Sequence, residues 1–143
     1  MAETLSLSEH QAYLEAAVAA ANAAPLSQRK AMLAVALADA FADHRFAAEA
    51  AGGDILAYRA ALAARYEPLA LVFSIAAHRP DGAQLVTEAV TIPIADYGSL
   101  QVEDFMVSLY NSHTVQRVRI VTPDGTRHDV HKVLAEALVT LSA

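Results

Sequence analysis

Residues 27–51 read SQRKAMLAVALADAFADHRFAAEAA, a stretch without glycine or proline that ends at Gly52 and Gly53. Most of its residues are strong helix formers, and glycine directly after a helical pattern marks a C-terminus. At 1.5 Å per residue, a helix of this length is a rod of roughly 35–40 Å, about the width of a small domain. The stretch therefore predicts one long helix around which the rest of the chain is organised.

The apolar side chains of this helix fall on two stripes when residues are placed at about 100° steps. The first stripe holds Leu33, Leu37 and Phe41, with His44 among them. The second holds Met32, Val35 and Phe46, with Asp39 among them. A helix that is apolar on two sides packs between two layers, so we expect it to be the most buried element. His44 and Asp39 are then either boundary groups or functional groups with shifted pKa values.

Composition narrows the class of protein. The 143 residues are most simply one domain, and 55% hydrophobic with 18% charged residues is typical of a folded globular chain. The net charge of −6 argues against a nucleic-acid or anionic membrane partner. The absence of cysteine excludes disulfides and thiolate chemistry and suits a cytoplasmic location. The alanine-rich run at 16–24 is too short and too weakly apolar for a membrane span.

Local patterns predict the order of elements. We expect helices over about 8–23, 27–51 and 54–66, with Ser8 and Asp54 as N-caps, and a strand over 69–78. A second strand over 83–92, a short helix over 99–111, strands over 114–121 and 126–128, and a helix capped by Asp129 follow. The fold class expected is α+β, with three N-terminal helices packed on an antiparallel sheet of three to four strands and two further helices. The helical part covers about 8–66 and the sheet-containing part about 69–141 of a single domain.

No sequence motif names a reaction. The chain has no phosphate-binding glycine loop, no GxSxG nucleophile turn and no HExxH metal motif. We therefore expect a small soluble binding module with no cofactor, which forms a homodimer or binds a small-molecule ligand.

The most coherent predicted surface is a sheet face of small and polar groups. Its members are Arg117 and Arg119 on one strand, Ser74 and His78 on another, and Thr87 and Thr91 between them. Such a face is solvated, binds an anion, or pairs with a second copy of itself. Tyr97 and Asn111 lie near polar loop segments, where ligand contacts are frequent. The ligand-binding residues expected are Arg117, Arg119, His78, Tyr97 and Asn111.

An enzyme that uses histidine and carboxylate is the alternative. Alternation places Glu88 between Val86 and Val90, where a general acid or base would face a pocket between sheet and helices. An edge strand or a bulge explains the same residue without function. His128 and His131 have a spacing that suits a metal with His113 as third ligand. Asp129 as a helix cap sets the two histidines apart, so we expect no metal. The catalytic residues of this alternative are His113, His128 and Glu88.

Overall fold

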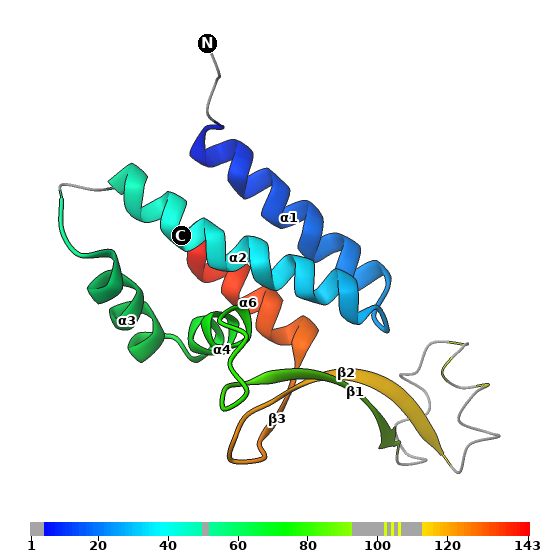
Figure 1. Cartoon of the computed structure of the whole chain (residues 1–143). Helices are drawn as coiled ribbons and strands as arrows, with labels where there is room; N and C mark the ends of the chain where they lie inside the picture. Colours follow the sequence, from blue (N-terminus) through cyan, green and yellow to red (C-terminus); the bar gives the residue numbers. More distant parts are fainter. Residues whose placement is uncertain (1–4, 50–51, 93–101, 103, 105, 107–112) are drawn as a thin grey trace.

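The computed structural model describes residues 5–49, 52–92, 102, 104, 106 and 113–143 (Figure 1). Its elements, in chain order, are α1 (Leu7–Ala23), α2 (Gln28–Glu49), α3 (Ile55–Arg65), α4 (Glu67–Ala76), β1 (Gln84–Thr91), β2 (Thr114–Val121), β3 (Arg127–Asp129) and α6 (Val130–Ser142). The predicted α+β class is confirmed, because N-terminal helices precede an antiparallel sheet and a C-terminal helix. The helix expected over 99–111 lies mostly outside the described residues.

The strand predicted over 69–78 is wrong, because this segment belongs to helix α4. Leu69, Val72 and Ile75 are buried and recur every three residues, which is a helical spacing. Pro68 lies in the first turn, where its missing N–H has no partner within the helix. The large and small alternation of this short run fits both structures, and packing against α2, α3 and α6 selects the helix.

Helix α2 is central, as the sequence predicts, and contacts α1, α3, α4, α6 and β1. In Figure 1 it lies between α1 and α6. Its buried residues are mostly alanines, namely Ala31, Ala34, Val35, Ala38, Phe41 and Ala42. Leu33 of the first predicted stripe is 56% exposed, so the buried side of the helix differs from the prediction. The helix is also not the most buried one, since six of its 22 residues are buried against five of 13 in α6.

Capping residues fix where the helices begin. Asp54 and Asp129 accept from the backbone N–H groups of Leu56 and His131, which confirms both predicted caps. The cap of α1 is Ser6, which forms a capping box with Glu9, two residues earlier than the predicted Ser8.

An ion-pair cluster accounts for Asp39. Arg59 on α3 pairs with Asp39 and with Asp43 on α2, and its guanidinium lies 4.2 Å from the ring centroid of Phe73 on α4. Asp39 is half-buried beside the Arg59 guanidinium, and this cluster joins α2, α3 and α4. Asp39 therefore has a structural role, which is one of the two interpretations that its position in the sequence allows.

The sheet lies at one end of the helices, where β1 and β2 form a curved ribbon (Figure 1). The strand order is β1-β2-β3, and Ile120 of β2 is opposite both Leu85 and His128. Residues directly opposite one another share a face of the sheet. The core face therefore carries Leu85, Val118 and Ile120, which join the hydrophobic core. The other face, here called the charged face, carries Glu88, Arg117, Arg119 and Arg127.

Candidate functional site

The polar sheet face predicted from the sequence does not form. Ser74 lies on α4, where its hydroxyl accepts from the backbone N–H of Ala83 at 2.9 Å and ties the helix to the start of β1. His78 follows α4 with φ +55° and donates its backbone N–H to Ile75, as a residue just beyond a helix end does. Both residues therefore serve the α4–β1 connection, and His78 is not part of a sheet surface.

The remaining members of that predicted face divide between the two sides of the sheet. Arg117 and Arg119 are opposite Glu88 and Val86 on the charged face. Thr87 and Thr91 belong to the core face, because a one-residue step along a strand changes the face. The structure thus brings the two arginines together but separates them from the threonines.

Three of the side chains named for the charged face, Glu88, Arg117 and Arg127, are in ion pairs. Arg127 donates its Nε–H to both carboxylate oxygens of Glu88 at 3.0 Å. Arg117 pairs with Asp104 at 3.1 Å. Within the described part of the chain, Arg119 is half-buried and has no ion pair. Glu88 therefore lies on the face away from the core and is held by an arginine, rather than facing a pocket between sheet and helices.

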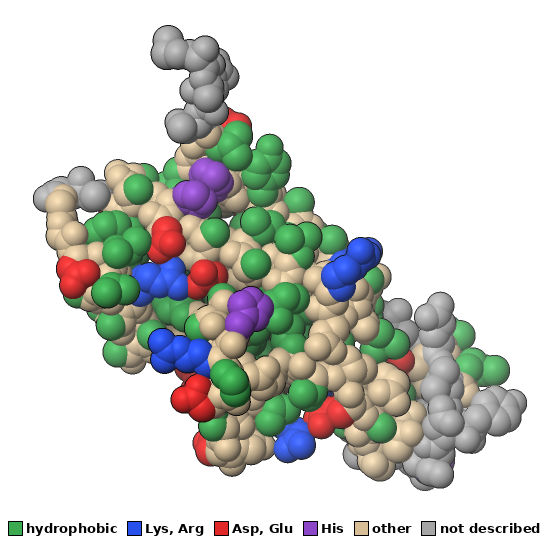
Figure 2. Space-filling view, viewed as in Figure 1, with side chains coloured by type: hydrophobic (Ala, Val, Ile, Leu, Met, Phe, Trp, Pro, Cys, Tyr) green, Lys and Arg blue, Asp and Glu red, His purple; other side chains and the backbone are tan. Residues whose placement is uncertain are grey.

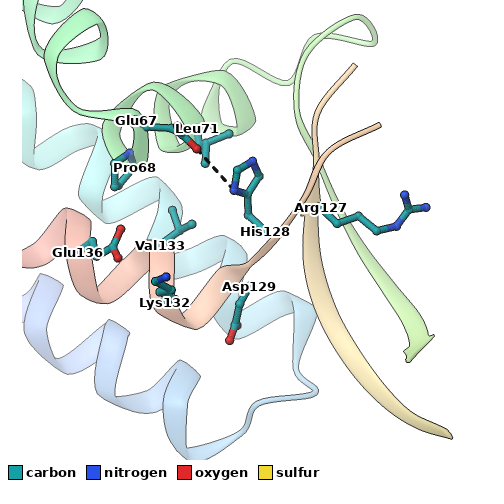
Figure 3. A pocket seen from close by; sticks show the side chains of 9 residues that line it. All are labelled: Glu67, Pro68, Leu71, Arg127, His128, Asp129, Lys132, Val133 and Glu136. Carbon is teal, nitrogen blue, oxygen red and sulfur yellow. Dashed lines mark ion pairs between the residues drawn. The ribbon is translucent and has the colours of Figure 1, made fainter. Parts of the chain in front are cut away.

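His128 lines a groove between α4, β3 and α6 (Figure 3). The groove has a volume of about 470 Å³. The His128 ring points toward α4, and its Nδ1 lies 3.6 Å from Oε1 of Glu67. Lys132 and Glu136 line the α6 side, whereas the Arg127 side chain points away. The groove thus holds one histidine and three exposed carboxylates, of which Glu67 is the one paired with the His128 ring.

The three residues of the catalytic alternative are not brought together. His128 is opposite Ile120, which is seven residues along β2 from His113, or about 23 Å at 3.3 Å per residue. Glu88 belongs to the opposite face of the sheet. Tyr97 and Asn111, expected to bind a ligand, lie outside the described residues.

His128 and His131 contact different elements. Nε2 of His131 lies 3.1 Å from the carbonyl oxygen of Pro25 in the α1–α2 connection, whereas His128 faces Glu67. A carbonyl accepts only, so Nε2 of His131 is the protonated nitrogen. Among the residues that the structure describes, no three histidines or carboxylates are close enough to hold a metal ion.

His44 stacks on His10 where α2 passes α1. The ring centroids are 3.6 Å apart and the planes differ by 10°. Burial lowers the pKa of His44, the neighbouring His10 lowers it further, and Asp43 partly opposes both. The folded state thus favours the neutral form of His44.

We expect this pair to make stability depend on pH. Below about 6.5, the unfolded chain protonates His44 more readily than the folded chain does, so stability falls as the pH drops. Thermal unfolding between about pH 7.5 and 5 measures this, and His44→Asn should show the smaller decrease in Tm because it removes the titrating ring. Equal decreases in the two proteins would contradict the assignment to His44.

The outer edge of β1 has no neighbouring strand in the described part of the chain. The backbone N–H of Ile92 donates to the carbonyl of His113 at 2.7 Å, which makes this a hydrogen-bonded pair. Alternation along an antiparallel ladder then directs the backbone groups of Leu85, Thr87, Ala89 and Thr91 outward. An independent contact agrees, since the outward carbonyl of Leu85 accepts from the side chain of Gln28 at 3.1 Å. Within the described residues, the outward backbone groups of Thr87, Ala89 and Thr91 have no partner.

Sequence reasoning missed this edge and also missed Gln28. The run QLVTEAVT contains neither proline nor lysine, the residues that commonly block an exposed edge. The lack of these residues could have indicated an exposed edge. The strand wrongly predicted over 69–78 instead put β1 next to another strand.

Figure 2 shows acidic and basic side chains interspersed on one face of the molecule, without a large patch of one sign. Among the helices in the described ranges, none combines the length and apolar character needed to cross a membrane.

Comparison of this chain with known proteins identifies no relative. No protein-family model, curated protein or solved structure matches the chain significantly. Only the geometry of this chain therefore bears on its function.

Proposed function

We propose that this chain is a small protein-interaction module that binds an extended segment of another chain along the open edge of β1. A second copy of the chain is the first partner to consider, which gives the homodimer expected from the sequence. The observation that carries the proposal is the row of outward backbone groups at Thr87, Ala89 and Thr91. Strand addition of this kind obtains its affinity from main-chain hydrogen bonds.

The position of the edge supports this function. The β1–β2 ribbon extends from one end of the helices (Figure 1). Gln28 borders the outer edge at the start of β1, where it contacts the Leu85 carbonyl and the Thr87 hydroxyl, each at 3.1 Å. Thr87, Ala89 and Thr91 are exposed and have small side chains, which permits close approach of a second backbone. The acid–base alternative has less support, because Glu88, His113 and His128 do not converge on one cavity.

Ala89→Pro tests the edge directly. Proline removes the outward N–H of residue 89 without removing a donor from the β1–β2 ladder, so the hairpin should be retained. The matched control is Ala89→Ser, which keeps the N–H. The probe is a synthetic peptide of alternating threonine and valine, and amide hydrogen exchange followed by NMR measures its binding.

At a chain concentration low enough that the protein is monomeric, with a mass of 15.2 kDa, we expect the peptide to slow exchange at the amides of Thr87, Ala89 and Thr91 in the wild type and at the same positions in Ala89→Ser. Ala89→Pro should bind the peptide at least about tenfold more weakly, since a backbone donor is lost and the ring obstructs the edge. Unchanged exchange at these amides in the wild type, or equal binding by Ala89→Pro, would contradict the proposed function.

A further inference from the structure

We infer that the partner of β1 is β1 of a second copy, paired antiparallel about a two-fold axis that passes beside Ala89. This inference rests on the proposed function, because it uses the same edge. It adds the identity of the partner and the register of the pairing. The two sheets would join through their β1 strands into one continuous sheet.

Backbone direction limits the possible registers. Hydrogen bonds across the new edge must join residues whose backbone groups point outward, and these are the odd-numbered residues of β1. A two-fold axis at Ala89 sets Ala89 against Ala89 of the second copy and Thr87 against Thr91 of the second copy. Thr87, Ala89 and Thr91, whose outward backbone groups have no partner among the described residues, then all form hydrogen-bonded pairs, each of which exchanges two bonds. The Thr87 hydroxyl keeps its own contact with Gln28.

Neighbouring registers are less favourable for reasons present in the structure. An axis at Glu88 sets two carboxylates directly opposite one another, and like charges in that position destabilise a strand pair. An axis at Thr87 requires the carbonyl of Leu85, which already accepts from Gln28. With an axis at Val90, Thr87 would be opposite residue 93 of the second copy, which lies outside β1, so Thr87 would have no partner in that strand. The register centred on Ala89 avoids all three problems.

Charge agrees with this register. Glu88 is then opposite Val90 of the second copy, and its own carboxylate is held by Arg127 at 3.0 Å. The two-fold axis makes the interface isologous, so the same strand is used on both sides and the assembly closes as a dimer. Closure matters because an open edge that pairs without symmetry continues into fibres.

Single cysteines measure the register. The chain has no cysteine, so each variant carries one thiol. Directly opposite residues in a hydrogen-bonded pair have Cα atoms about 5.5 Å apart, a separation that a disulfide spans. Ala89→Cys should therefore give a covalent dimer on mild oxidation, with twice the chain mass of 15.2 kDa.

Thr87→Cys and Glu88→Cys are the matched controls, because each would form the faster cross-link in one of the competing registers. We expect both to cross-link at least about tenfold more slowly than Ala89→Cys, since a disulfide tolerates Cα separations only up to about 7 Å. An equal mixture of Thr87→Cys and Thr91→Cys should form a mixed dimer efficiently. Faster cross-linking of either control than of Ala89→Cys would overturn the inference.

Light scattering separates failure of this inference from failure of the proposed function. At about 100 µM, the wild type and Ala89→Ser should have twice the mass of Ala89→Pro. A wild-type mass of 15.2 kDa at this concentration would overturn self-pairing. If the threonine and valine peptide still protected the three edge amides, the proposed function would stand with a different chain as partner. If neither the dimer nor peptide protection occurred, both would fail.

Discussion

Phe41→Ala should lower the free energy of unfolding by about 3–5 kcal/mol, the usual cost of emptying a buried aromatic site. Phe41 is 2% exposed and is the largest fully buried side chain in the described part of the chain. It lies on α2, the helix that contacts α1, α3, α4 and α6, so neighbouring side chains have little freedom to refill the space. Urea unfolding followed by circular dichroism measures the change.

Leu33→Ala on the same helix is the matched control. Leu33 is 56% exposed, so its truncation should change the free energy of unfolding by no more than about 0.5 kcal/mol. A similar loss in both variants would mean that α2 packs with a different side toward the core.

Ala34→Leu should destabilise the fold by about 1–3 kcal/mol, although it adds apolar surface. Ala34 has 0% exposure in the alanine-lined side of α2, where the neighbouring helices leave no space for three more carbon atoms. Accommodation requires strained rotamers or a displacement of a helix axis. The same urea experiment measures the effect.

Ala36→Leu provides the comparison for that substitution. Ala36 is exposed on the same helix, and leucine is nearly as good a helix former as alanine, so its effect should stay within about 0.5 kcal/mol. If Ala34→Leu were as well tolerated as Ala36→Leu, close packing of α2 would be contradicted.

The long helix was predictable because length, helix propensity and a terminal glycine pair agree over 25 residues. Which side of this helix is buried was not predictable, because hydrophobic periodicity gives weight to large side chains such as leucine and little to alanine. Close helix packing reverses that weighting, because a small side chain lets two backbones approach. Leu33 is therefore exposed, whereas Ala34 and Ala38 are in the core.

The assignment of residues 69–78 had the larger consequence for function. A ten-residue apolar run fits both a strand and a buried helix, and only tertiary packing decides between them. Once α4 is a helix, β1 has β2 as its one described neighbour, and no other described strand pairs with its outer edge. The candidate interaction edge could thus not be derived from the strand pattern alone.

Some roles of the candidate site residues were predictable from the sequence and others were not. Asp129 was predictable as a cap from its position before an apolar stripe, and that local role explains why His128 and His131 contact different elements. The pairing of Glu88 with Arg127 depends on strand order, which connects residues 39 positions apart. Local chemistry was therefore accessible from the sequence, whereas cross-strand partners were not.

Pairing β1 with β2 requires a larger loss of chain entropy than pairing α1 with α2. Only four residues, 24–27, join α1 to α2, but 22 residues, 92–113, separate β1 from β2. Loop-closure entropy grows with the logarithm of loop length, so the longer connection costs about 1.5 kcal/mol more to close. We therefore expect the α1–α2 pair to form earlier in folding than the β1–β2 ribbon. Contacts of the ribbon with the core must offset its larger loss of chain entropy.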